Sequence, residues 1–263
     1  MNSVTVPALQ QMKHDGRKIV GVVAWDFQIA QIADRADVDI VSVGDSVGIN
    51  LWGHSNPLEV TMDEMIVVCK AVRRGTKRAM VSCDLPFGPL QEGVNSAVRA
   101  AIRIVKEAGA DMIKLDGAAD FPEAVTAIVH AGIPVFAQFG ITPQTALQSG
   151  VEQSAAKLVE AARRLEGAGA ALLDFTHSGP VAGPAVVNAV SIPVIGGLGG
   201  GPWLDGRMRM AHAAIGYAAS ALESKTETYA NVARITLDAL TAYAEDVRAA
   251  RQIKGGIPVK PAS

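Results

Sequence analysis

The stretches "EAGADMIKLDG" (107–117) and "GAGAALLDFTHSG" (167–179) share one pattern. In each, a helix ending in Ala or Gly leads into a run of apolar residues, and that run ends in small or polar residues. Near-continuous apolar runs of this length are typical of parallel strands that are buried on both faces. The same pattern predicts further strands within 17–27, 35–46, 78–88, 130–140 and 190–200.

Segments with helical periodicity separate these strands, at 62–74, 94–108, 154–168 and 229–251. Thr61 followed by Glu64 forms a capping-box pattern for the first of them. No Pro- or Ser-rich linker divides the 263 residues. Repeated strand–helix units at this length favour one (β/α)8 TIM barrel over a doubly wound sheet. We therefore expect a single α/β domain over residues 1–263, with the eighth strand near 214–218.

Composition and charge exclude several classes of partner. The formal net charge is −2 and the pI is near 6.2, which gives no basic surface for nucleic acid. The sequence has no apolar run of roughly 18 residues for a membrane span, and its first residues do not resemble a signal peptide. The two cysteines, Cys69 and Cys83, form neither a disulfide framework nor a paired zinc motif. These features predict a cytoplasmic protein without a nucleic-acid or membrane partner.

Polar residues recur where the predicted strands end, which is where barrels place their catalytic groups. A single Asp there is most often a helix cap or a turn residue. Several carboxylates at one barrel mouth repel one another unless a cation offsets them, and this predicts a hard divalent metal such as Mg²⁺. A metal and a lysine around a carbonyl acid can stabilise an enolate. The strand-end residues are Asp26, Asp45, Ser46, Asp84, Lys114, Asp116, Gln138, Asp174, Thr176 and His177.

The run "GGLGGG" (196–201) lacks the spacing of a dinucleotide-binding fingerprint. Two interpretations stay open for it. It could bind an anion through backbone N–H groups, or it could form a turn where another segment needs close approach. Cys83, with no base beside it in the sequence, is interpreted as a small apolar residue rather than a nucleophile.

Over essentially its whole length the chain resembles ketopantoate hydroxymethyltransferase, a (β/α)8 family of the phosphoenolpyruvate mutase/isocitrate lyase-like superfamily. The motifs that carry the resemblance are "IVSVGDSVG", "CDLPF", "EAGADMIKLDG", "GIPVFAQFGITPQT" and "SIPVIGGLGGGPWLDG". The resemblance implies a reaction of pantothenate biosynthesis in which Mg²⁺ chelates a branched 2-oxo acid and a base removes its C3 proton. The enolate then attacks a one-carbon unit delivered by 5,10-methylenetetrahydrofolate. It also implies a large homo-oligomer, such as a decamer.

The resemblance assigns roles to residues of this chain. Asp45 and Asp84 match the family's metal-site aspartates, Ser46 its contact with the substrate carboxylate, and Lys114 its active-site lysine. We expect a metal site of Asp45, Asp84 and Asp116. We expect a substrate site of Asp45, Ser46, Asp84, Lys114 and Gln138, and catalytic groups among Lys114, Asp116, Asp174 and Thr176.

Three positions depart from the family pattern. Asp116 replaces a glutamate, Gln138 replaces a histidine, and Thr176 occupies the position of the glutamate that the family is presumed to use as general base. A threonine hydroxyl does not act as a base near pH 7 without activation. Asp174 lies two residues earlier on the same face of the strand, roughly 6–7 Å deeper in the barrel, and His177 follows directly. Either residue could replace the base.

These departures leave alternatives to transfer onto 3-methyl-2-oxobutanoate. The acceptor could be a related 2-oxo acid. The chain could instead be a Mg²⁺-dependent C–C lyase or hydrolase of the same superfamily, although no cysteine loop of the lyase type follows Lys114. It could also be a 2-oxo acid-binding paralogue that has lost catalysis.

Overall fold

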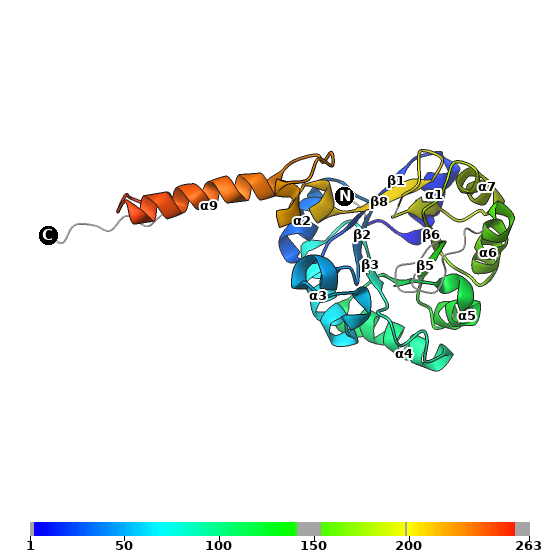
Figure 1. Ribbon diagram of the computed structural model, residues 1–263. Coiled ribbons are helices and arrows are strands. Elements are labelled where there is room, and N and C mark those ends of the chain that lie inside the picture. Colours follow the sequence, from blue (N-terminus) through cyan, green and yellow to red (C-terminus); the bar gives the residue numbers. More distant parts are fainter. Residues whose placement is uncertain (1–2, 141–153, 198, 256–263) are drawn as a thin grey trace. The chain divides into compact units, whose positions relative to one another are not determined.

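The computed structural model describes residues 3–140, 154–197 and 199–255, and the chain divides into two compact units, Met1–Ala211 and His212–Ser263. The first unit is a closed barrel in which eight parallel strands follow one another in sequence order (Figure 1). The predicted (β/α)8 barrel is therefore confirmed, while a single domain over 1–263 stays a prediction. The strands are β1 (Ile19–Val23), β2 (Ile40–Val43), β3 (Met80–Asp84), β4 (Met112–Leu115), β5 (Val135–Gly140), β6 (Leu172–Thr176), β7 (Val194–Gly196) and β8 (Gly206–Met210).

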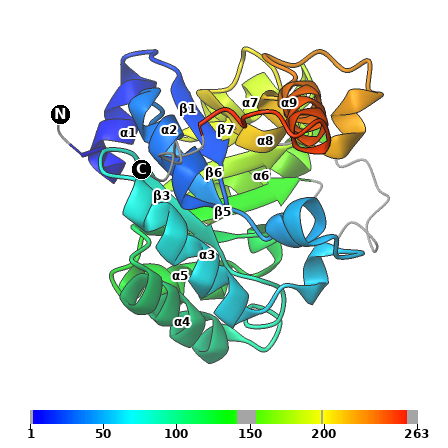
Figure 2. The same ribbon diagram turned by 90° about the vertical axis from the view of Figure 1, so that its left-hand side faces the viewer.

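Helices cover the outside of the barrel, and neighbours such as α2 and α3, α4 and α5, and α6 and α7 pack side by side (Figure 2). The predicted capping box is present, because Thr61 and Glu64 bond to each other's backbone N–H groups at the start of α3. The helices of this unit are α1 (Val6–His14), α2 (Phe27–Arg35), α3 (Met62–Gly75), α4 (Val94–Arg103), α5 (Pro122–His130), α6 (Ala155–Gly167) and α7 (Ala182–Ala189). Short 3₁₀ or π segments are η1 (Gly48–Trp52), η2 (Pro57–Glu59), η3 (Ile104–Ala108) and η4 (Ala118–Asp120).

The eighth strand lies at Gly206–Met210, so its predicted position near 214–218 is wrong. β8 alternates between buried Met208 and exposed Arg207 and Arg209. It closes the barrel by pairing with β1 and β7. A half-exposed strand alternates apolar and polar residues, so it lacks the continuous apolar run that identified the other seven.

The barrel has two hydrophobic layers, because successive strand residues point in opposite directions. Outward-facing residues such as Val81 and Ile113 pack against the helices. Inward-facing residues fill the barrel below its carboxyl-terminal end, and Leu9 and Met12 of α1 pack into this inner cluster from outside the strands. The other buried members of the inner cluster are Ile19, Ile40, Met80, Met112, Phe136, Ala171, Leu172, Ile195 and Met208.

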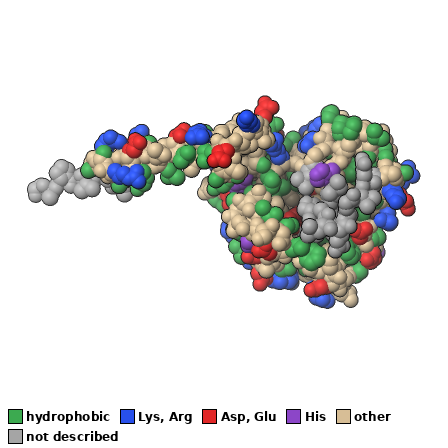
Figure 3. Space-filling model, in the orientation of Figure 1, with side chains coloured by type: hydrophobic (Ala, Val, Ile, Leu, Met, Phe, Trp, Pro, Cys, Tyr) green, Lys and Arg blue, Asp and Glu red, His purple; other side chains and the backbone are tan. Residues whose placement is uncertain are grey.

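The second unit contains the end of α8 (Ala211–Ala214), the 3₁₀ segment η5 (Ala219–Leu222) and the helix α9 (Val232–Arg248). Hydrophobic side chains reach the surface along α9, between charged ones (Figure 3). Leu240, Tyr243 and Val247 are more than half exposed and lie on one face of this helix by their spacing of three and four residues. Among the described residues, no helix is long and apolar enough to cross a membrane.

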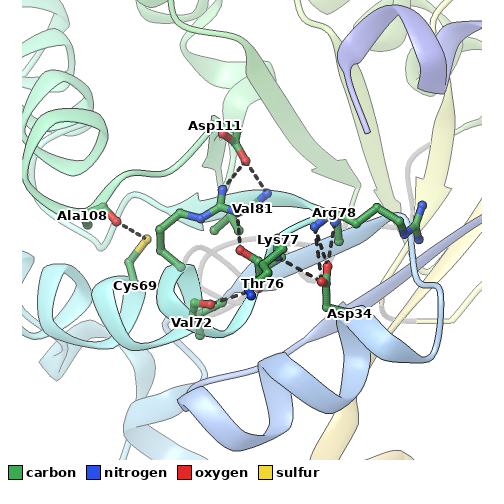
Figure 4. Close-up of polar contacts among 11 residues, drawn as sticks. Asp34, Cys69, Val72, Thr76, Lys77, Arg78, Val81, Ala108 and Asp111 are labelled. Carbon is green, nitrogen blue, oxygen red and sulfur yellow. Dashed lines mark hydrogen bonds and ion pairs between the residues drawn. The ribbon is translucent and has the colours of Figure 1, made fainter. Parts of the chain in front are cut away.

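The turn that leads into β3 is held by one carboxylate at the end of α2 (Figure 4). Asp34 accepts hydrogen bonds from the backbone N–H groups of Lys77 at 3.0 Å, Arg78 at 3.0 Å and Ala79 at 2.8 Å. Burial raises the pKa of Asp34, but these three N–H groups outweigh burial, so the pKa lies below its ordinary value. The carboxylate thus satisfies backbone donors that no strand partner reaches.

Replacing Asp34 by Ala is expected to lower the free energy of unfolding by about 2 kcal/mol, because charge-assisted hydrogen bonds to three N–H groups are lost and water replaces them only in part. Since the pKa is lower in the folded state, this stabilisation is present above pH ~4 and fades as the pH falls through the folded-state value. Urea unfolding at pH 7 and pH 3 measures both effects. Asp37→Asn is the control: Asp37 pairs with Arg78 but is 79% exposed, so its loss is expected to cost under about 1 kcal/mol. An equal cost for the two variants at pH 7 would contradict the assignment.

Candidate active site

Six polar side chains are buried at the carboxyl-terminal ends of four neighbouring strands. They belong to the inward-facing set, since each alternates with an outward core residue along its strand. The carboxyl end of a barrel is the end that carries catalytic groups. The residues are Asp84 of β3, Lys114 and Asp116 at the end of β4, Gln138 of β5, and Asp174 and Thr176 of β6.

Lys114 lies at the centre of this cluster. Its Nζ is 3.4 Å from Oδ1 of Asp84 and 3.7 Å from Oδ2 of Asp174, and it donates a hydrogen bond to Oε1 of Gln138. Gln138 in turn donates from Nε2 to Oδ1 of Asp116 at 3.1 Å. One ammonium therefore connects residues from four strands, and the structure brings together five of the predicted site residues.

Burial and charge act in opposite directions in this cluster. Burial alone would lower the pKa of Lys114, but the carboxylates around it, Asp84 and Asp174 first, raise it well above its ordinary value. Lys114 is therefore a cation. Burial raises the pKa of Asp84 to about 7 despite Lys114, and the charges of Asp45 and Asp116 contribute to this rise. The cluster holds more negative than positive charge, so it favours the binding of a further cation.

Asp45 and Ser46 follow β2 and are half-buried beside Asp84. The N–H of Asp45 donates to Oδ2 of Asp84 at 3.4 Å. Gly44 makes room for this arrangement, because a Cβ there would lie 2.8 Å from Oγ of Ser46 and 3.6 Å from Oδ2 of Asp84. Ser46 and Asp84 thus lie next to the same glycine.

The donor set fits a hard divalent cation held in part by solvent or substrate. Oδ1 of Asp84 is buried and accepts no hydrogen bond from the described residues, although Lys114 Nζ is near it. Within the described part of the chain, no three His, Cys, Asp or Glu side chains are grouped as a complete metal site. Mg²⁺ is commonly bound by one or two carboxylates plus waters and substrate oxygens, and Asp45 and Asp84 could supply such carboxylates, with Asp116 nearby.

Thr176 and His177 differ sharply at the end of β6. Thr176 is buried, and its hydroxyl donates to the backbone oxygen of Phe139 at 3.0 Å. The strand ends there, and His177 adopts a left-handed backbone conformation with φ of 54° and an exposed side chain. Positive φ is uncommon outside glycine and costs energy that the surrounding structure must supply. His177 therefore does not continue the buried row to which Asp174 and Thr176 belong.

The glycine run contacts an anion, but the anion belongs to the protein. Gly197 donates its N–H to Oδ1 of Asp174 at 3.0 Å. Arg207 of β8 holds the same segment by donating to the backbone oxygen of Gly200 at 2.8 Å. A Cβ on Gly200 would lie 2.7 Å from Leu204 and from Ser178, which supports the close-approach interpretation.

Two of the strand-end residues, Asp26 and Cys83, have structural roles and do not belong to the polar cluster. The side chain of Asp26 accepts from the N–H of Ile29 and caps α2. Cys83 faces outward and is fully buried, and burial raises the pKa of its thiol, as expected for an apolar packing residue. The residues "ITPQ" (141–144) of the motif "GIPVFAQFGITPQT", and Leu198 of the glycine run, lie outside the described residues.

Sequence reasoning missed two residues that shape the site, Gly44 and Arg207. For Arg207, the alternation "GRMRM" was a usable strand signal. Binding of an anion by N–H groups of the glycine run was one of the two open interpretations, but that Asp174 is an anion bound by Gly197 is visible only in the structure.

A closed α/β barrel with polar and charged side chains buried at the carboxyl ends of its strands is typical of enzymes that act on small molecules. The chain belongs to the ketopantoate hydroxymethyltransferase family, whose sequence profile matches residues 3–252. It is 40% identical over 255 residues to the 3-methyl-2-oxobutanoate hydroxymethyltransferase of Cyanothece sp., covering 93% of this chain and 96% of that one. It is 39% identical over 252 residues to the enzyme of the same name from Moorella thermoacetica, covering 93% of each chain. The family is one of transferases, as expected from the sequence.

Solved structures show the same fold at low sequence identity. The chain superposes on 2,3-dimethylmalate lyase, a member of the PEP mutase/isocitrate lyase superfamily, with a TM-score of 0.63 and 14% identity over 98% of this chain and all of that one. Phosphonopyruvate hydrolase, solved with oxalate and Mg²⁺, gives a TM-score of 0.61 and 14% identity over 97% of this chain and 92% of that one. These similarities support the barrel fold expected from the resemblance.

Proposed function

We propose that this chain transfers a hydroxymethyl group from 5,10-methylenetetrahydrofolate to a branched 2-oxo acid, 3-methyl-2-oxobutanoate or a close analogue, with Mg²⁺. The observation that carries the proposal is the buried ammonium of Lys114 between Asp84 and Asp174, beside an Asp84 oxygen that accepts no hydrogen bond from the described residues. The shared name of the relatives supplies the reaction.

Asp45 and Asp84 would hold the metal, and Asp116 would add negative charge beside it. When bound, Mg²⁺ supplies a Lewis acid that polarises the 2-oxo group. The protein residues bind and orient the acid. Lys114 and Ser46 can donate hydrogen bonds to its carboxylate. Gln138 orients the lysine by accepting a hydrogen bond from its ammonium group. In this buried site each such hydrogen bond is stronger than it would be in water.

The proposal is tested by incubating the protein with Mg²⁺, 5,10-methylenetetrahydrofolate and 3-methyl-2-oxobutanoate, and measuring ketopantoate by mass spectrometry. A panel of 2-oxo acids identifies the preferred acceptor. Release of pyruvate or glyoxylate from 2-hydroxy or 2-oxo diacids would instead indicate the lyase or hydrolase alternative. Mg²⁺-dependent binding of a 2-oxo acid without any product would indicate a binding paralogue and contradict the proposed transfer.

A homo-oligomer also forms part of the proposal, supported by the apolar face of α9. Leu240, Tyr243 and Val247 form an exposed apolar patch on this helix, and such patches often mark contacts between protein chains. Light scattering at micromolar concentration is expected to give a multiple of 27.3 kDa, and Tyr243→Lys is expected to lower the mass. Asp238→Lys, on the opposite side of the helix, is the control and is expected to keep the assembly. A monomeric parent protein would contradict the proposal. A cytoplasmic location stays a prediction of the sequence.

A further inference from the structure

We propose that Asp174 is the catalytic residue that accepts the C3 proton of the 2-oxo acid. This inference rests on the proposed function and deepens it, because it assigns the base of the enolisation step to one side chain. Three observations carry it: the other candidates are engaged elsewhere or, like His177, lie outside the buried row, Asp174 shares a cation with the metal-site carboxylate, and its environment makes it a stronger base than an exposed carboxylate.

The first observation concerns the competing groups. The hydroxyl of Thr176 donates a hydrogen bond to the backbone oxygen of Phe139, and this bond orients the hydroxyl as a donor. Asp116 accepts a hydrogen bond from the side-chain amide of Gln138. Asp84 provides the oxygen suited to the metal. Asp174 is therefore the buried carboxylate of the cluster that neither the metal nor the Gln138 amide engages.

The second observation is position. Asp174 is 3% exposed and comes from β6, across the cluster from Asp84 of β3. Both carboxylates lie within ion-pair distance of the Lys114 nitrogen, at 3.7 Å and 3.4 Å. In a 2-oxo acid, C3 is separated from the carboxylate carbon only by the oxo carbon. A substrate that pairs with Lys114 and faces Asp84 therefore brings C3 near Asp174.

The third observation is the way Asp174 is held. Its Oδ1 accepts the N–H of Gly197 at 3.0 Å, which fixes the carboxylate plane. Its Oδ2 lies 3.7 Å from Lys114, beyond ordinary hydrogen-bond distance, so a lone pair remains for a proton. Burial raises the pKa of Asp174 although Lys114 and the Gly197 N–H oppose the rise. A general base is most effective when its pKa lies near the pH at which the enzyme works.

The step balances without a further reactant. The C3–H bond breaks, its proton moves to Oδ2 of Asp174, and its electron pair forms the enolate, whose negative charge lies on the former oxo oxygen. Lys114 stays protonated and faces that charge. In the absence of the one-carbon donor, the proton returns to C3, and in D₂O a deuteron replaces it.

Exchange of the C3 proton in D₂O, followed by ¹H NMR with Mg²⁺ and 3-methyl-2-oxobutanoate, isolates this step. Asp174→Asn keeps an oxygen for the Gly197 N–H but removes the base, so the exchange rate is expected to fall by about 100-fold or more. Affinity for oxalate, an enolate mimic, measured by calorimetry with Mg²⁺, is expected to stay equal or become tighter, since a negative charge near the anion is lost.

Asp205→Asn is the matched control. Asp205 also accepts one backbone N–H, from Val194 at 2.8 Å, and pairs with one lysine, Lys13 at 2.9 Å, but it lies at the amino-terminal end of β8. This variant is expected to exchange C3–H at the parent rate even if its Tm falls. A loss of exchange in both variants would show a structural effect and overturn the proposal.

A second variant covers the case in which Asp174→Asn folds poorly. Asp174→Ala leaves space for a small carboxylic acid, and added formate is expected to restore part of the exchange, which a merely structural role would not allow. Exchange at the parent rate in Asp174→Asn, or no formate rescue in a folded Asp174→Ala, would overturn the assignment and leave the proposed function standing. If the parent protein exchanges no 2-oxo acid, the proposed function fails, and this inference with it.

Discussion

Replacing Asp84 by Asn is expected to lower ketopantoate formation by about 1,000-fold or more while the barrel stays folded. The substitution removes one of the two carboxylates proposed to hold the metal and lowers the negative charge that attracts it. Because Asp84 is buried and repelled by Asp45 and Asp116, its loss also relieves strain between like charges in the metal-free protein. The Tm of the metal-free variant is therefore expected to equal or exceed that of the parent.

The pKa of Asp84 adds a pH dependence to this prediction. Burial raises that pKa to about 7, and a metal binds only the deprotonated carboxylate. Protons therefore compete with Mg²⁺ below pH 7, and apparent Mg²⁺ affinity is expected to fall about tenfold per pH unit as the pH drops from 7 to 5. Since the folded state holds this proton more tightly than the unfolded chain, the metal-free protein loses stability as the pH rises from about 4 to 7.

Calorimetric titration with Mg²⁺ at several pH values, together with the activity assay, measures both effects. Asp111→Asn is the control. Asp111 pairs with Arg73 at 2.8 Å and accepts the N–H of Val81 at 2.9 Å before β4, at the amino-terminal end of the barrel (Figure 4). This variant is expected to keep Mg²⁺ binding. Unchanged Mg²⁺ affinity in Asp84→Asn would show that the metal is held elsewhere.

Lys114→Met is expected to lower activity by about 1,000-fold and also to destabilise the protein. The ammonium is the cation that faces Asp84 and Asp174, and breaking a buried ion pair leaves a charge without compensation, at a cost of about 3–5 kcal/mol. Activity falls because no cation remains to bind the substrate carboxylate or to face the enolate oxygen.

The destabilisation of Lys114→Met is expected to depend on pH with a definite sign. Without the lysine, the pKa values of Asp84 and Asp174 rise further, because Lys114 is the largest of the effects that oppose burial at both carboxyls. Protonated carboxyls need no counter-ion, so the difference in Tm between variant and parent is expected to shrink as the pH falls from 8 to 5. Lys114→Arg keeps the charge and is expected to recover stability better than activity. A pH-independent loss of Tm would mean that packing, and not charge, accounts for the effect.

The sequence predicted seven strands correctly because each reads as an apolar run, and six of them, β2 to β7, are buried on both faces. It misplaced β8, because Arg207 and Arg209 are exposed and interrupt that run. The start of α3 was predictable from the capping box at Thr61, a local signal that needs no tertiary context. Strands and helix starts were thus predictable from the sequence wherever residues of the same element determine them.

The sequence predicted which residues lie at the site, but not which of them contact one another. That Asp84, Lys114 and Asp174 lie at the barrel mouth follows from their positions at strand ends. Which of them touch depends on the stagger between strands: Asp84 stands beside Lys114 in the register, whereas Asp174 stands beside Gln138. The reach of the lysine side chain across β5 then decides the second ion pair, and no sequence pattern encodes that reach.

The helix α1 gives the barrel a further property. Leu9 and Met12 insert into the inner cluster with Phe136 and Leu172, and all four are buried. The end of the barrel away from the carboxylates is therefore plugged by side chains. We therefore expect both substrate and product to pass through the carboxyl-terminal end of the barrel.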